Sequence, residues 1–312
     1  MKLMKQNYIL INILLLLSSF AVQAQPNYPS SPYEAKLIFE DVDRFIEVFN
    51  SLTKSSDTLK ILDEEYLTNG SSGLKEYISR HGLTASMLTK ALANYPEVYN
   101  QLAKEFPKEK KKYQKKYTAE MVRYKAVIND AMFPPTYFLV GAYRGIAQAS
   151  RPGQLVTIEK NWDNPDRKFS TIIHELTHFQ QARALGFGEY ASTYGKENNM
   201  LDLILREGGA EFVTYYLVRK NTKSYPRLNY VNEREAELKD RFKKDLVNQD
   251  KSYWLWDSID QDEVPILLGY TLGFKICEAY YEKASDKKQA LKDILGIQDS
   301  TDFLAKSQYL SK

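Results

Sequence analysis

Apolar side chains recur at helical spacing through the first part of the chain. Between Tyr33 and Ile128 they return every three or four positions, the period of a helix with one buried face. The clearest run is Leu37, Ile38, Val42, Phe45, Ile46 and Phe49. Gly82 follows a later run in the position of a helix end. We therefore predict a helical N-terminal region over residues 25–130.

The pattern changes after two consecutive prolines, Pro134 and Pro135. Thr136 to Val140 and Gly153 to Ile158 are short apolar runs, which predict two strands. We expect the second strand to run antiparallel to the first. Helical spacing then returns from Asn164-Pro165 to Leu185, with Gly186 as the terminator.

The remaining segments continue the helical pattern with interruptions. Residues 187–199 are rich in glycine, tyrosine and asparagine and predict a loop. A second helix is predicted from Met200 to Arg219, a charged helical stretch from Val231 to Val247, and a last pair of helices from about Ile266. The pattern predicts a helix-rich α+β fold, in which residues 131–312 form a second unit with a small antiparallel sheet before the helix 164–185.

The N-terminus has the features of an export signal. Lys2 and Lys5 precede a mostly apolar stretch, residues 8–20, and Val22-Gln23-Ala24 places small residues before a cleavage point at Gln25. An uncleaved anchor is the alternative, but the apolar run is shorter than the 18 or so residues that span a bilayer. We predict a signal peptide over residues 1–24 and a periplasmic or extracellular protein without a stable membrane span.

Charge and cysteine content narrow the function classes. The formal net charge of +3 on 312 residues gives no electrostatic argument for nucleic-acid binding. Six lysines between residues 108 and 116 indicate a solvated helix face, with a basic docking face as the alternative. Cys277 is the single cysteine, so no internal disulfide can form, and its apolar surroundings favour a buried thiol over a nucleophile. Nothing in the composition sets an oligomeric state.

The segment His174-Glu175-Leu176-Thr177-His178 has the spacing of a metal site. Two histidines four positions apart share one face of a helix and can bind one zinc ion. The glutamate between them can reach a water molecule at that ion instead of the ion itself. The third histidine of the chain, His81, is predicted to be a surface or capping residue.

Two glutamates on the second predicted helix offer a third ligand. Glu207 and Glu211 also lie four positions apart, among apolar neighbours, where carboxylates without a cation are costly. We assign Glu207 as the zinc ligand and Glu211 as the residue that orients a histidine; the reverse assignment is the alternative. Gly208-Gly209 between them indicates the close approach of another backbone or an ion.

Three protein ligands leave one coordination position open, as in hydrolytic zinc sites. Glu175 is then the general base, and a carbonyl oxyanion needs a further donor. Tyr270 is our candidate for that donor, with Tyr194 as the alternative. The predicted strand at Leu155 to Ile158 could bind an extended peptide by edge pairing, or belong to a purely structural hairpin.

These residues resemble the gluzincin metallopeptidases, in which a glutamate on a downstream helix is the third zinc ligand. Residues 207–212, Glu-Gly-Gly-Ala-Glu-Phe, are similar to a string that follows the zinc helix in bacterial collagenases and in predicted zinc-dependent proteases of unknown substrate. Residues 138–141 and 269–274 also resemble the predicted protease group. The resemblance covers about Phe133 to Tyr280 and leaves out the helical N-terminal region.

The resemblance implies a zincin-like core and a set of roles. The implied zinc ligands are His174, His178 and Glu207, with Glu175 as base and Glu211 in a supporting position. Metzincins are excluded, because Gln181 and Ala184 stand where those enzymes have a glycine and a third histidine. Collagen as a substrate does not follow, because the chain has no room for the large accessory modules.

The sequence therefore predicts an exported zinc peptidase that acts on peptide or protein substrates. The alternative from another class is a catalytically silent cell-envelope binding or scaffolding protein that keeps the zincin-like fold. Metal content and cleavage of a peptide library separate the two hypotheses.

Overall fold

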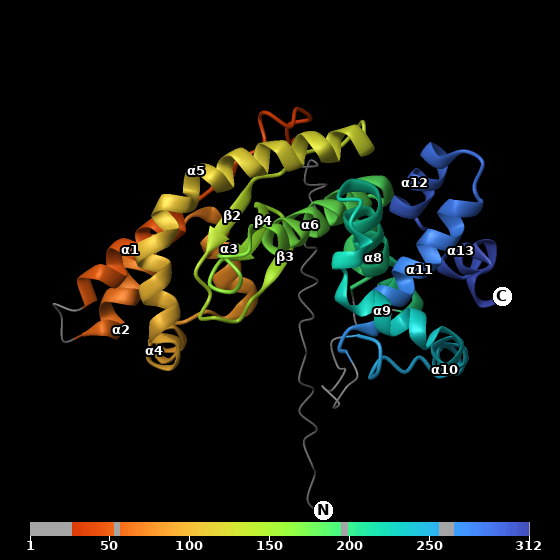
Figure 1. Ribbon diagram of the computed structural model, residues 1–312. Helices are drawn as coiled ribbons and strands as arrows, with labels where there is room; N and C mark the ends of the chain where they lie inside the picture. The colour runs from red at the N-terminus through yellow and green to blue at the C-terminus, as the bar shows by residue number, and fades with distance from the viewer. Residues whose placement is uncertain (1–26, 53–56, 195–198, 256–264, 312) are drawn as a thin grey trace, which may run out of the picture.

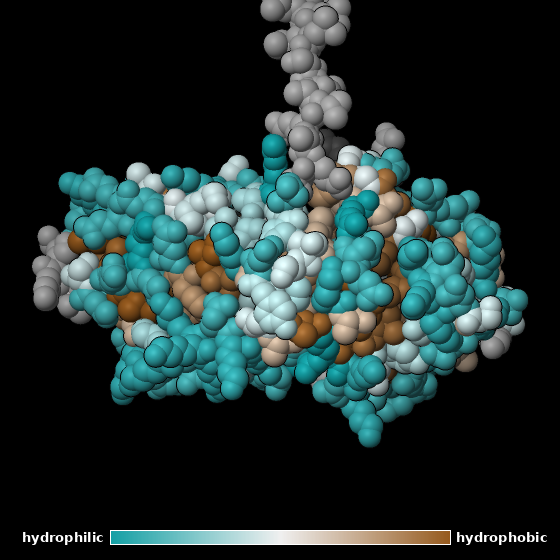
Figure 2. Space-filling view, turned by 90° about the horizontal axis from the view of Figure 1, so that it is seen from above, coloured by the Kyte–Doolittle hydropathy of each residue, from teal (hydrophilic) through white to brown (hydrophobic). Residues whose placement is uncertain are grey.

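The computed structural model describes residues 27–52, 57–194, 199–255 and 265–311 of the chain (Figure 1). The predicted signal peptide, residues 1–24, lies outside the described residues. Within the described ranges, every helix is too short or too polar to traverse a lipid bilayer. Seen from above, the surface is mostly hydrophilic, with hydrophobic side chains gathered in small areas (Figure 2).

The described residues before position 130 are helical except for one short strand. Its elements are β1 (Leu37–Ile38), α1 (Glu40–Leu52), α2 (Thr58–Ile61), the π-helical turn η1 (Leu62–Leu67), α3 (Ser72–His81), α4 (Ala85–Asn94) and α5 (Pro96–Val127). The helical assignment of Leu37 and Ile38 is wrong, because their backbones pair with Thr136 and Tyr137. Tertiary pairing here overrides the local spacing, and the helix begins at Glu40.

The sheet has four strands in the order β1-β2-β4-β3, where β2 is Thr136–Leu139, β3 is Ala147–Ser150 and β4 is Gly153–Thr157. β2 and β4 are parallel, so the predicted antiparallel pairing of these two strands is wrong. The sequence pattern missed β3, which forms an antiparallel hairpin with β4 through a two-residue turn. Because β3 reverses the chain first, β4 returns in the direction of β2.

The described residues after the sheet are again helical. Its elements are α6 (Pro165–Leu185), α7 (Phe187–Ser192), α8 (Met200–Glu211), the π-helical turn η2 (Phe212–Val218), the 3-10 turn η3 (Thr222–Ser224), α9 (Pro226–Glu233), α10 (Glu235–Asn248), α11 (Leu268–Lys283), α12 (Lys287–Leu295), α13 (Ser300–Ser307) and the 3-10 turn η4 (Tyr309–Ser311). Two expectations are wrong: the predicted loop 187–199 contains α7, and three helices follow residue 266 instead of two.

The two helices that the sequence marked for the metal site are confirmed as helices. The side chain of Asn164 caps α6 by accepting a hydrogen bond from the backbone N–H of Arg167, and Gly186 ends the helix at a φ of 96°. The predicted helix from Met200 to Arg219 is present as α8 followed by η2.

A long helix and a shared core fix the position of α6. In Figure 1, α5 runs from the N-terminal helices across the top of the molecule toward α6. The hydroxyl groups of Tyr124 on α5 and Thr177 on α6 are 3.1 Å apart. One hydrophobic cluster contains residues from Ala35 to Tyr309, so the N-terminal helices pack on the same core as the helices that follow the sheet.

The two helices α8 and α11 touch through glycines. A Cβ atom at Gly208 would lie 2.3 Å from the carbonyl carbon of Gly273, and one at Gly273 would lie 2.0 Å from the backbone oxygen of Ile204. Any side chain at either position would push the helices apart, since backbone atoms cannot give way. The expected close approach at Gly208 is therefore confirmed, and it fixes the position of the neighbouring Glu207.

Candidate metal centre

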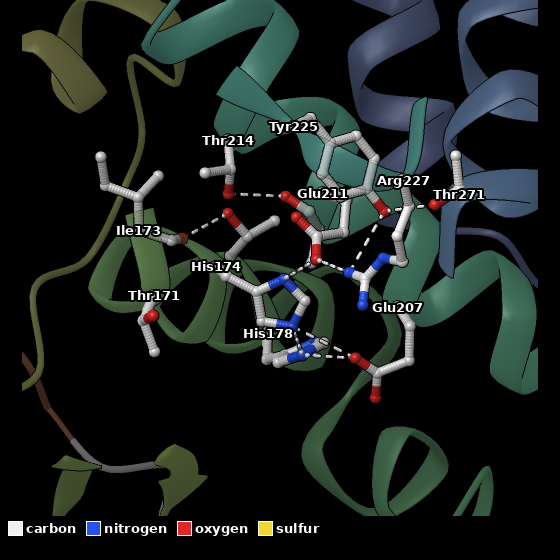
Figure 3. Close-up of polar contacts among 12 residues, drawn as sticks. Thr171, Ile173, His174, His178, Glu207, Glu211, Thr214, Tyr225, Arg227 and Thr271 are labelled. Atoms are coloured by element: carbon white, nitrogen blue, oxygen red, sulfur yellow. Dashed lines mark hydrogen bonds and ion pairs between the residues drawn. The ribbon is translucent and has the colours of Figure 1, made fainter. Parts of the chain in front are cut away.

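The contact between α6 and α8 brings the three predicted ligands together. His174 Nε2 and His178 Nε2 are 3.0 Å apart. Glu207 Oε2 lies 3.2 Å from the first nitrogen and 3.4 Å from the second (Figure 3). Among the described residues, this is the one group of three such side chains that could hold a metal ion.

The geometry of this triangle fits zinc. Ligand atoms at about 2.0–2.1 Å from a tetrahedral zinc ion are separated from one another by about 3.3–3.4 Å. The observed separations of 3.0–3.4 Å are close to that value. Two imidazoles and one carboxylate are also a donor set that zinc uses in sites with an open coordination position.

The ring of His178 is oriented by a residue that the sequence reasoning used only to exclude metzincins. His178 Nδ1 and Gln181 Oε1 are 2.8 Å apart, and Gln181 Nε2 donates to the backbone oxygen of Arg206 at 2.8 Å. Since the amide oxygen can only accept, Nδ1 carries the proton and Nε2 presents its lone pair to the centre. The signal that could have identified Gln181 is its place three positions after His178, on the same helix face.

The ring of His174 has a different environment. Its Nδ1 is buried without a hydrogen-bond partner, and the nearest carboxylate oxygen, Oε1 of Glu211, is 3.8 Å away. Burial by itself would lower the pKa of His174, but the hydrogen bond to Glu207 and the charges of Glu211 and Glu207 raise it to about 9. The site therefore attracts positive charge.

Glu207 is held from the side opposite its histidine contacts. The hydroxyl of Tyr194 donates to Glu207 Oε1 at 3.1 Å, and the hydroxyls of Tyr190 and Tyr194 are 3.2 Å apart. Burial raises the pKa of Tyr194 well above its usual value, so this hydroxyl stays protonated. Burial would also raise the pKa of Glu207, but the two histidines outweigh it and hold this pKa well below the usual range.

Glu175 lies on the side of the centre that faces the sheet. The backbone N–H of Ala149 on β3 lies near its carboxylate and favours the charged form. Only 7% of the residue is exposed. Burial raises the pKa of Glu175, and the charge of Glu207 adds to the effect, while the two histidines oppose it. The carboxylate is thus a stronger base than an exposed one.

The remaining predicted residues lie on the α9 and α11 side. The ring of Tyr270 is parallel to that of His174, with centroids 6.1 Å apart. Glu211 forms an ion pair with Arg227, whose Nη2 is 3.2 Å from Oε1. Arg227 has no regular spacing to the other site residues, so no sequence signal pointed to it. The orienting role of Glu211 on a histidine stays a prediction.

Two residues outside the motif have structural positions. His81 ends α3, and its Nε2 is 2.8 Å from the side-chain oxygen of Gln148 on β3. Cys277 is buried as predicted, and burial raises the pKa of its thiol. Neither residue belongs to the metal-binding group found among the described residues.

Comparison with known proteins adds one family assignment. A family model described as "Predicted Zn-dependent protease (DUF2268)" matches residues 140–295. No curated protein and no solved structure matches the chain. The matched segment is half of the chain, and it contains both α6 and α8 with all three candidate ligands. The protein therefore belongs to this family of predicted zinc-dependent proteases.

Proposed function

We propose that this protein is a zinc-dependent peptidase of the gluzincin type, with a zincin-like core. His174, His178 and Glu207 are the zinc ligands, and Glu175 is the general base. The observation that supports the proposal most directly is the triangle of ligand atoms, 3.0–3.4 Å on each side, built from two helices. Bound zinc would lower the pKa of a water molecule toward about 7 and polarise the substrate carbonyl.

The chain's own residues would perform the proton transfers. Glu175 takes a proton from the attacking water as the water oxygen bonds to the carbonyl carbon. It then gives the proton to the amide nitrogen as the C–N bond breaks, so that a carboxylic acid and an amine result. The burial that raises the pKa of Glu175 brings its basicity closer to that of the groups with which it exchanges protons.

An extended peptide is the substrate form that suits the sheet. β4 has neighbours on both sides and forms a hairpin with β3, so of the two alternatives for Leu155 to Ile158 the edge pairing is wrong and the structural hairpin is confirmed. β3 is the edge strand next to α6, and the backbone N–H of Ala149 on it lies near Glu175. A peptide that adds to β3 by backbone pairing would therefore lie next to the general base.

Two measurements on purified protein test the proposal. We expect one zinc ion per chain by elemental analysis, and cleavage of a broad peptide library that stops on chelation and returns with zinc. Glu175→Gln should retain zinc and lose cleavage by about 10²- to 10⁴-fold, the usual contribution of a general base. Zinc in the expected amount without any cleavage would support the scaffolding alternative.

We also propose export, with cleavage after Ala24, from the sequence features at residues 1–24. Mass spectrometry of the mature protein should find Gln25 at the N-terminus of the cell-envelope or secreted form. An intact N-terminus in that fraction would contradict the cleavage.

A further inference from the structure

Arg227 is a cation beside the metal centre, and it has no part in the proposed proton transfers. It is the second residue of α9, and it pairs with Glu211. Its carbon Cζ lies 5.3 Å from the ring centroid of Tyr225 and 5.6 Å from that of Tyr270. Tyr270 is in turn parallel to His174. Arg227 therefore belongs to the wall next to His174.

The three nitrogen atoms of this guanidinium differ in what they can still bind. Nη2 donates to Glu211 at 3.2 Å and to the hydroxyl of Tyr225 at 3.5 Å. Nε is buried and without a partner. Nη1 has no hydrogen-bond partner among the described residues, and it is not buried. In Figure 3 it points away from Glu211, toward the side of His174 on which Glu207 lies.

Because only one nitrogen of Arg227 is free, the kind of group that can bind to this side chain is limited. Arginine captures a carboxylate with two parallel N–H donors, which need two accessible nitrogens on one edge. In Arg227, Nη2 is already engaged and Nε is inaccessible, so only Nη1 is available. This arrangement suits a single oxygen atom, as in a peptide carbonyl, better than the terminal carboxylate of a peptide.

The positions of β3 and α9 indicate which carbonyl of the peptide would bind to Arg227. β3 with the Glu175 contact and α9 with Arg227 lie on opposite sides of the region where α6 meets α8 (Figure 1). A peptide paired with β3 would pass the ligand triangle with Arg227 across from the general base. We propose that Nη1 of Arg227 donates to the carbonyl oxygen of the cleaved peptide bond and stabilises the negative charge that develops there. This inference rests on the proposed peptidase function.

The contacts of Arg227 would hold it ready for that task. Glu211 fixes one end of the guanidinium, and the rings of Tyr225 and Tyr270 contact its carbon. The hydroxyl of Tyr225 is itself held by a donated hydrogen bond from Thr271 at 2.9 Å. A donor that is oriented before the reaction stabilises a developing oxyanion without reorganising during it.

Kinetics of Arg227→Gln on an internally quenched peptide, built around a bond that the wild type cleaves, test the proposal. We expect kcat to fall by about 10²- to 10³-fold, as on removal of an oxyanion donor, while KM changes much less. Arg227→Lys should recover part of the loss and keeps the test open if Arg227→Gln does not fold. The control is Arg234→Gln, at the end of the same helix and exposed, which should retain wild-type activity.

A binding measurement separates a catalytic role from a structural one. A phosphinic analogue of the same peptide imitates the tetrahedral state, and its affinity, by calorimetry, should fall with Arg227→Gln by the same factor as kcat/KM. Zinc content and the affinity for the cleaved product should not change. A normal kcat, a change confined to KM, or lost zinc in the variant would overturn the role of Arg227. A wild type that cleaves nothing would instead overturn the peptidase function, and this inference with it.

Discussion

The two histidines of α6 are supported in different ways on the two sides of the centre. On one side, His178 is hydrogen-bonded to Gln181, and Gln181 donates a hydrogen bond to a backbone oxygen of α8. On the other side, the Nδ1 atom of His174 has no hydrogen-bond partner, and the carboxylate 3.8 Å from it belongs to Glu211, which is in an ion pair with Arg227. We call these the Gln181 side and the Arg227 side.

This difference indicates a division of tasks. On the Gln181 side, a neutral amide that is itself anchored to the backbone of α8 holds the Nδ1 atom of His178, so it can fix this imidazole in a single orientation. The Arg227 side is charged and retains an unused N–H donor, so it can respond to a substrate. Holding the metal and binding the reacting carbonyl would then fall to different walls of one site.

The largest effect on zinc affinity is expected at Glu207, which contacts both histidines. Zinc binding in proteins is worth about 10–16 kcal/mol, so losing one of three protein ligands should cost about 3–5 kcal/mol. We expect Glu207→Gln to weaken zinc affinity by more than about 100-fold, measured by competition with a chromophoric chelator. Glu189→Gln, an exposed charge change on α7, is the control. Unchanged affinity in Glu207→Gln would remove this carboxylate from the metal site.

The next largest effect is expected on stability, at the backbone contact between α8 and α11. Gly208→Ala would place a methyl group 2.3 Å from the backbone of Gly273, so α8 and α11 must separate. We expect a loss of about 2–3 kcal/mol in the free energy of unfolding, measured by urea denaturation. At Gly209 the nearest atom is a side-chain nitrogen 3.3 Å away, so Gly209→Ala should cost less. Equal costs for the two variants would contradict the backbone contact.

The helices that carry the candidate ligands could be predicted from the sequence, whereas the strands and side chains around them were predicted less well. The helices α6 and α8 follow from local signals: apolar spacing, the cap at Asn164 and the terminator Gly186. The four-residue spacing placed His174 and His178 on one face, and the structure brings Glu207 within 3.4 Å of both. These features depend on residues close together in the chain.

The remaining features depend on contacts between distant segments. The predicted direction of β4 was wrong because β3 reverses the chain before it. β3 consists of small and polar residues without a clear apolar pattern, so the sequence contained no signal for it. Arg227 was missed because its place beside His174 depends on how α9 packs on α11, which no spacing encodes. Gln181 could have been identified from its position three residues after His178.

The Gln181 side can be tested by itself. Gln181→Ala removes the acceptor for His178 Nδ1 and the donor to the backbone oxygen of Arg206. We expect zinc affinity to fall by about 10- to 100-fold, the usual cost of losing a residue that orients a ligand. Gln114→Ala on the exposed face of α5 is the matched control. A normal affinity in Gln181→Ala would mean that α6 alone fixes the ring of His178.

The smallest effect on zinc is expected on the Arg227 side. Glu211 Oε1 lies 3.8 Å from His174 Nδ1, which is beyond hydrogen-bond distance, so Glu211→Gln should weaken zinc affinity by less than about tenfold. The same change removes the charge that holds Arg227, so kcat on the quenched peptide should fall by more than zinc affinity does. If Glu211→Gln instead costs more zinc affinity than Gln181→Ala, then Glu211 orients His174 as the sequence predicted. In that case the division between a metal-holding side and a substrate side is wrong, because both walls would serve the metal.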